Sequence, residues 1–199
     1  MAKLYFKYGA MGSSKTAQAL ITKFNYEERG MRVWLIKPAT DNRDGEGVLT
    51  SRAGLQSECT PIPSGESITD LFLSSHSDSN VIIADESQFF TAEQIDQFRF
   101  IVDKYDVPVM CFGLRTDFMT KMFEGSKRLF EVADSISEIK TMCSCGRKAT
   151  VNARLGQGGK ILTRGSKIFL GGNERYIAMC HKCWAERIAS ERENDNEKG

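Results

Sequence analysis

The feature that most constrains the fold is a short glycine-containing loop near the N-terminus. An apolar segment, residues 3–8, leads directly into Gly9-Ala10-Met11-Gly12-Ser13-Ser14-Lys15-Thr16. This run matches the pattern G-x-x-x-x-G-K-[ST], except that Ser14 takes the place of the second glycine. Helical spacing follows the loop, in Ala17, Leu20, Ile21 and Phe24. The order of strand, loop and helix predicts a phosphate-binding loop (P-loop).

Such a loop has a defined chemistry. Its successive backbone N–H groups surround the phosphates of a nucleotide, and the following helix points its positive N-terminal end at the same charge. Lys15 is expected to reach the β- and γ-phosphates, and the Thr16 hydroxyl to bind Mg²⁺. The alternative is a polar connection that happens to contain a lysine, and the flanking strand and helix patterns disfavour it.

The first two thirds of the chain alternate between strand-like and helix-like segments. This alternation predicts a parallel α/β sheet with helices on its faces and ligands at the carboxyl ends of its strands. Between Pro38 and Ser67 the chain is polar, with weak strand signals near Val48 and Cys59. The expected strands are residues 3–8, 31–37, 81–84 and 107–112. The expected helices are residues 15–29, 68–73 and 91–105, together with a segment around 129–133. A capping box at Thr91 is expected to begin the helix at 91–105.

The pattern changes after about residue 139, where strands and glycine-rich turns replace the alternation. We therefore expect three parts. Residues 1–139 form a P-loop α/β domain, and residues 140–189 form a small β-rich domain. Residues 190–199 are charged and are expected to form a disordered tail.

Four of the six cysteines occur as two close pairs, Cys143-Ser-Cys145 and Cys180-His-Lys-Cys183. In a reducing compartment this spacing favours a metal site over disulfides. Four thiolates make a closed tetrahedral zinc site with no open position for catalysis, so we expect a structural role. We expect His181 to be a surface residue, since Cys183 completes the ligand set.

A second candidate element is the acidic pair Asp85-Glu86, which follows the apolar run 81–84. Asp85 is placed to help hold Mg²⁺, and Glu86 to orient or deprotonate an attacking oxygen. These features do not separate a kinase from an ATPase. The nearby phenylalanines at 89, 90, 118 and 123 could stack on a nucleobase or belong to the core, and composition leaves both open.

Composition limits the partners. The chain has 199 residues, with 27 Lys and Arg against 26 Asp and Glu, so it has no basic surplus for binding nucleic acid. No segment approaches the ~20 apolar residues of a membrane span. Met1-Ala2-Lys3 leads into a strand rather than a signal peptide. We expect a cytoplasmic protein with no membrane and no nucleic-acid partner.

The ordered set of motifs resembles the type II thymidine kinases, the family of the human cytosolic enzyme and many bacterial and phage enzymes. The resemblance extends over residues 3–184. It is carried by residues 9–16, Asp85-Glu86-Ser87-Gln88-Phe89-Phe90, Gly113-Leu114-Arg115-Thr116-Asp117-Phe118, the two cysteine pairs, and Gly171-Gly172-Asn173-Glu174-Arg175-Tyr176 between them.

The resemblance implies transfer of the ATP γ-phosphate to the thymidine 5′-hydroxyl, giving dTMP and ADP, with Glu86 as general base. It implies that residues 1–139 are a P-loop ATP-binding domain and that residues 140–189 are a zinc-ribbon domain with a substrate-binding loop. It also implies Thr16 and Asp85 as Mg²⁺ ligands, a structural Zn²⁺, a homotetramer and feedback inhibition by dTTP. Arg43 and Arg52 would lie in the segment that closes over the phosphates. The implied ATP site is Gly9, Ala10, Met11, Gly12, Ser13, Ser14, Lys15, Thr16, Asp85, Glu86, Ser87 and Gln88. The implied substrate site is Met11, Phe89, Leu114, Phe118, Ile168, Phe169, Leu170, Gly171, Gly172 and Tyr176.

The chain departs from the family pattern at three places. Ser14 stands where many members have glycine, Ser87 where Gly or Ala is common, and Cys143 and Cys145 are separated by one residue rather than two. Two other functions are alternatives: a P-loop ATPase in which Glu86 activates water, and a non-enzymatic zinc ribbon that binds nucleic acid.

Overall fold

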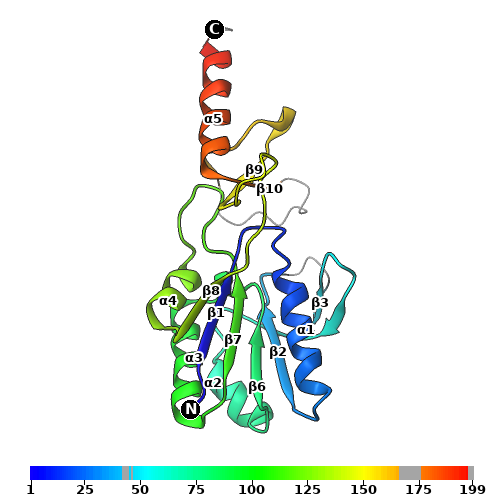
Figure 1. The fold of residues 1–199 in the computed structure, drawn as a ribbon. Coiled ribbons are helices and arrows are strands. Elements are labelled where there is room, and N and C mark those ends of the chain that lie inside the picture. The colour runs from blue at the N-terminus through cyan, green and yellow to red at the C-terminus, as the bar shows by residue number, and fades with distance from the viewer. Residues whose placement is uncertain (42–44, 46, 166–175, 197–199) are drawn as a thin grey trace.

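The fold is organised by a six-stranded, wholly parallel sheet (Figure 1). The computed structural model describes residues 1–41, 45, 47–165 and 176–196. The strand order is β5-β2-β6-β7-β1-β8. The strands are β1 (Leu4–Tyr8), β2 (Val33–Pro38), β5 (Thr60–Ile62), β6 (Val81–Ala84), β7 (Val109–Gly113) and β8 (Ser135–Glu138).

Helices cover both faces of the sheet, as the alternation predicts. In β6, Ile82 and Ala84 belong to a core packed under α3 (Ala92–Tyr105) and α4 (Glu124–Val132). Val81 and Ile83 point to the other face and pack with residues of α1 (Lys15–Glu27). Because every side chain of β6 is buried, this strand is an uninterrupted apolar run.

The α3 helix begins as the sequence predicts. Thr91 Oγ1 accepts a hydrogen bond from the Gln94 N–H at 3.1 Å, and the Thr91 N–H donates to Gln94 Oε1 at 3.2 Å. This reciprocal pair is a capping box. Preceding it are the short helix α2 (Ile68–Leu71) and a π-helical turn, η1 (Phe72–His76).

A second, smaller module stands beyond the carboxyl ends of the strands (Figure 1). The antiparallel pair β9 (Val151–Arg154) and β10 (Tyr176–Met179) forms its centre, with a 3₁₀ turn η3 (Gln157–Gly159) after β9. Helix α5 (His181–Asn196) extends away from the body of the molecule. The module has its own small core, built of Cys143, Ala149, Ala153, Ile161, Met179 and Cys180.

The structure differs from expectation at several elements. The edge strand β8 was not predicted. The weak strand signals near Val48 and Cys59 are confirmed, because β3 (Val48–Thr50) contains Val48 and Cys59 lies between β4 (Gln56–Glu58) and β5. Strands β3 and β4 form an antiparallel pair apart from the main sheet. Ala133 caps α4 rather than lying within it. Helix α5 continues past Ser190 to Asn196, where we expected a disordered tail. Pairs spaced i,i+4, such as Arg187 with Glu191, support this helical course.

Within the described residues, no helix combines the length and apolar character needed to cross a membrane.

Candidate functional site

The P-loop connects the end of β1 to the start of α1 and is tightly packed. A Cβ at Gly9 would lie 2.4 Å from the carbonyl oxygen of Ile139 and 2.4 Å from Ser13 Oγ, so only glycine fits there. Gly12 has φ +75°, a conformation that favours glycine. The Nη1 of Arg52 lies 3.7 Å from the position of a Cβ built on Gly12, so Arg52 borders the loop.

The Lys15 ammonium occupies the centre of this loop. It donates hydrogen bonds to the carbonyl oxygens of Gly9 at 3.1 Å and Ala10 at 2.9 Å. It also lies 3.3 Å from the Ser13 hydroxyl. Lys15 is 8 % exposed, so its positive charge is held within the ring of loop backbone where a phosphate would bind.

Ser14 adopts the conformation that the missing glycine would favour. Its backbone has φ 62° and ψ 28°, in the left-handed region, and its side chain makes no capping hydrogen bond to α1. The loop therefore keeps a conformation suited to glycine although the residue carries a Cβ, at a conformational cost of about 1 kcal/mol.

Asp85 meets the P-loop at the carboxyl end of β6. The Thr16 hydroxyl donates to Asp85 Oδ2 at 2.7 Å, which brings together the two residues expected to hold Mg²⁺. Asp85 is 1 % exposed. Burial, followed by the negative charge of Glu86, raises the pKa of Asp85 to about 7. A cation at this position would relieve the unfavourable burial of the carboxylate.

Glu86 is held by an adjacent buried amide. The Gln88 Nε2 donates to Glu86 Oε2, and Gln88 Oε1 accepts from the Leu114 N–H at 2.9 Å. Gln88 is 2 % exposed, and both ends of its side chain are engaged in these bonds. The Glu86 backbone is left-handed, with φ 49° and ψ 35°. Gln88 thus ties the candidate base to the residues that follow β7.

Small residues allow these segments to approach one another. Ser87 is fully buried, and its hydroxyl has no hydrogen-bond partner among the residues that the structure describes. A Cβ at Gly113 would lie 2.6 Å from Ser87 Oγ, and one at Gly125 would lie 2.7 Å from the Ser87 carbonyl oxygen. The backbone after β6 is therefore wedged between the end of β7 and the start of α4.

The phenylalanines that the sequence left undecided divide into two groups. Phe90 is buried against Phe98 in the main core. Phe89 is only partly buried and packs edge-on against Phe123, with ring centroids 5.5 Å apart. Phe118 is 1 % exposed and lies on the side of the second module.

Two functional candidates on β9 were not predicted. The Arg154 guanidinium carbon lies 5.1 Å from the centre of the Phe118 ring and 6.0 Å from that of the Tyr176 ring, so Arg154 contacts both aromatic residues. Asn152 contacts the P-loop and the segment after β7. Polar residues alternating with apolar ones in Val151-Asn152-Ala153-Arg154 were a usable signal of a strand with one polar face.

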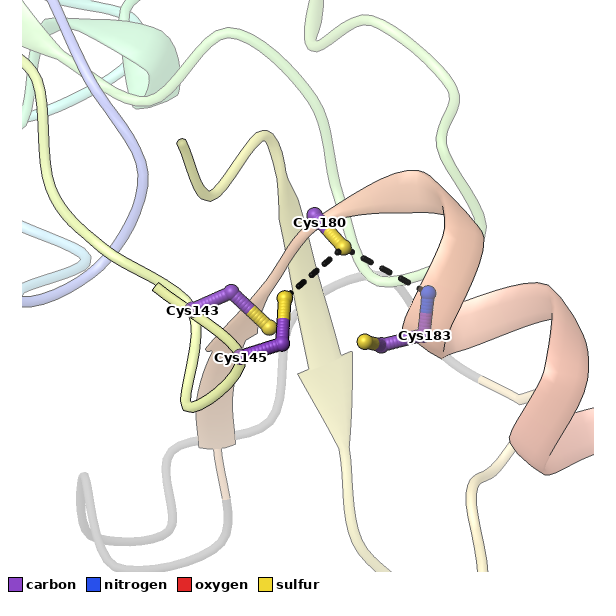
Figure 2. A group of neighbouring side chains, drawn as sticks. All are labelled: Cys143, Cys145, Cys180 and Cys183. Carbon is purple, nitrogen blue, oxygen red and sulfur yellow. Dashed lines mark hydrogen bonds between the residues drawn. The ribbon is translucent and has the colours of Figure 1, made fainter. Parts of the chain in front are cut away.

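The four predicted zinc ligands converge in the second module (Figure 2). Their sulfur atoms all lie within 4.8 Å of one another, and Cys145 Sγ is 3.6 Å from Cys180 Sγ. Thiolates about 2.3 Å from a tetrahedral zinc ion are separated by ~3.8 Å, which this group matches. Cys180 Sγ accepts from the Cys183 N–H at 3.4 Å. His181 packs against Trp184 instead of joining the sulfurs. The cluster fits a structural Zn²⁺.

Several predicted residues lie outside the described part of the chain. They are Arg43 and the five substrate-loop residues Ile168, Phe169, Leu170, Gly171 and Gly172.

Replacing Ser14 with glycine should stabilise the protein. The change removes the cost of a Cβ at φ 62° and should raise the free energy of unfolding by about 1 kcal/mol, as measured by urea denaturation. Ser77 has φ −63°, so Ser77→Gly is the matched control and should be neutral or destabilising. Equal responses at both positions would contradict this account.

Asp85 should make the stability of the magnesium-free protein depend on pH. Its folded-state pKa, about 7, exceeds the 3.8 of the unfolded chain, so the folded state binds more protons between these values. The free energy of unfolding should therefore fall as pH rises through this window. Urea denaturation of wild type and Asp85→Asn between pH 5 and 8.5 should show a steeper fall for wild type. Parallel curves would contradict the assignment.

Comparison with known proteins agrees with this geometry. The family model described as thymidine kinase matches residues 2–184. The thymidine kinase of Yersinia pseudotuberculosis is 42 % identical over 190 residues, covering 94 % of this chain and 97 % of the relative. The thymidine kinase of Enterobacteria phage T4 is 43 % identical over 188 residues, with 94 % and 97 % covered. The chain therefore belongs to the thymidine kinase family.

Proposed function

We propose that this protein transfers the γ-phosphate of ATP to the 5′-hydroxyl of thymidine, giving dTMP and ADP. The observation that carries the proposal is the chain of contacts around Glu86. On one side Glu86 adjoins Asp85, which is bonded to the P-loop through Thr16. On the other, Gln88 connects it to Leu114, at the start of the segment that the family resemblance assigns to thymidine. A carboxylate is thus held between the expected phosphate donor and the expected acceptor.

In this proposal Glu86 is the general base. The thymidine hydroxyl is a very weak acid, so Glu86 takes its proton as the oxygen bonds to phosphorus, not beforehand. Gln88 orients the receiving carboxylate by donating to Oε2. The leaving ADP oxygen carries the developing charge, which Lys15 and the N–H groups at the start of α1 stabilise.

Thr16 and Asp85 are the residues that would hold Mg²⁺. Their oxygens already lie 2.7 Å apart at the edge of the P-loop. Bound there, the ion would neutralise charge on the β- and γ-phosphates. Asp85 serves as a ligand in its deprotonated form.

The second module supplies the other side of the proposed thymidine site. The Arg154 guanidinium lies near the rings of Phe118 and Tyr176. The other described members of the implied substrate set are Met11, Phe89 and Leu114. The zinc site anchors the start and end of this module, since its ligands precede β9 and follow β10. The family resemblance adds two further proposals, a homotetramer and feedback inhibition by dTTP.

The direct test is a panel of nucleosides incubated with ATP and Mg²⁺. We expect ADP release to depend on thymidine, with little release from the protein alone. ATP turnover at the same rate without any nucleoside would favour a P-loop ATPase. Affinity for DNA that falls steeply with salt, without turnover, would favour a nucleic-acid-binding zinc ribbon.

Changing Glu86 to glutamine should separate catalysis from binding. Loss of the proton acceptor is expected to lower kcat by about 10²-fold or more, with ATP binding nearly intact. Glu28, at the far end of α1, offers the control Glu28→Gln, which should leave kcat unchanged. Near-normal turnover in the Glu86 variant would rule out its role as the base.

Removal of one zinc ligand should weaken the binding of thymidine, because it disturbs the second module. Cys180→Ser is expected to release zinc and raise the KM for thymidine, because the metal holds the segments on either side of β9 and β10. Cys59 lies outside the cluster, so Cys59→Ser is the matched control. Unchanged metal content and thymidine KM in the Cys180 variant would refute the tethering role.

A further inference from the structure

Asn152 makes an unusual connection between two distant parts of the chain. It lies on β9 of the second module and is 3 % exposed. Its Oδ1 accepts a hydrogen bond at 2.8 Å from the Met11 N–H of the P-loop. Its Nδ2 donates at 2.9 Å to the carbonyl oxygen of Thr116, in the segment after β7. One side-chain amide therefore joins three segments at the centre of the site.

The two bonds fix the orientation of this amide. A carboxamide has one acceptor end and one donor end, and here the acceptor faces a backbone N–H and the donor faces a carbonyl. Rotating it by half a turn would place two donors together and two acceptors together. Because the group is buried, losing either partner would leave a polar backbone atom without water to replace it.

Asn152 is also closely connected to the zinc cluster. In the antiparallel pair it lies opposite Ala178, two residues before Cys180. Its neighbour Ala153 packs in the same small core as Cys143 and Cys180. The position of Asn152 therefore depends on the module that the metal holds together. A second, longer contact runs in parallel, from the Thr141 hydroxyl to the Gly12 carbonyl oxygen at 3.4 Å.

We propose that Asn152 is a positioning residue that couples the zinc module to the P-loop and so helps set the affinity for ATP. The inference rests on the proposed ATP site at residues 9–16. It assigns the zinc module a role at the phosphate donor as well as at the nucleoside. By holding the Met11 N–H, Asn152 fixes the first half of the loop, while Thr116 fixes Asn152.

The test is ATP binding by Asn152→Leu, measured with a fluorescent ATP analogue on the full-length, zinc-loaded protein. Leucine keeps the branched heavy-atom skeleton of asparagine but can form neither hydrogen bond. We expect the Kd for ATP to rise about fivefold to tenfold, the effect of losing a buried hydrogen bond. Zinc content should be unchanged. Asn152→Ala should show at least as large an effect.

Asn80 provides the matched control. Its Oδ1 accepts from the Arg32 N–H at 2.7 Å, a similar bond in the connection that enters β6, at the opposite end of that strand from Asp85. Asn80→Leu should leave the Kd for ATP within twofold of wild type. An Asn152→Leu protein that binds zinc and keeps wild-type ATP affinity would overturn the proposal, whatever its KM for thymidine.

Removing zinc with a chelator completes a thermodynamic cycle. Stripping the metal should weaken ATP binding severalfold in wild type and much less in Asn152→Leu, because the connection is already broken. Equal weakening in both proteins would overturn the coupling through Asn152. Wild-type protein that binds no ATP would instead refute the proposed function, so the two failures are distinguishable.

Discussion

The hydrogen bond between the Thr16 hydroxyl and Asp85 joins the two elements on which the site depends. Thr16 lies in the first turn of α1, which follows β1, and Asp85 directly follows β6; β7 lies between these two strands. Only a parallel sheet brings both carboxyl ends to the same edge. Gln88, Leu114 and the second module are arranged around this contact. The parallel sheet therefore brings the P-loop, the Asp85-Glu86 pair and the segment after β7 to one edge.

This edge contains backbone conformations and a buried carboxyl group that are unfavourable by themselves and that the surrounding packing holds in place. Ser14 and Glu86 both have left-handed backbones, and Asp85 is a buried carboxyl whose pKa is raised by burial and by its neighbour. Such features concentrate at functional sites, because the surrounding packing holds them in place. Here the packing comes from Gly9, Gly113 and Gly125, each of which contacts backbone or side chains too closely to carry a Cβ.

The parts of the candidate site that depend on local patterns could be predicted from the sequence. The P-loop, the acidic pair and the four cysteines are short motifs whose chemistry follows from spacing, and their expected proximity is confirmed for Thr16 with Asp85 and for the four sulfurs. The main strands and the capping box were also predictable, because buried parallel strands are apolar runs.

The remaining elements depend on contacts between distant segments. The strands β5 and β8 are only three and four residues long and lie at the sheet edges, so their sequences carry weak signals and pairing with β2 and β1 defines them. The proposed roles of Asn152 and Arg154 depend on how the second module docks on the first, which no spacing in the chain specifies. Gln88 was predicted as a phosphate-site residue, but its partners, Glu86 and Leu114, became visible only in three dimensions.

In the proposed reaction, a nucleoside hydroxyl rather than water lies against the terminal phosphate of ATP at the carboxyl edge of the sheet. The most direct measurement follows the label from γ-³²P-ATP in the presence of Mg²⁺ and thymidine. We expect the label to appear in thymidine 5′-monophosphate and to depend on thymidine. Label released as inorganic phosphate at a rate that thymidine does not change would contradict it.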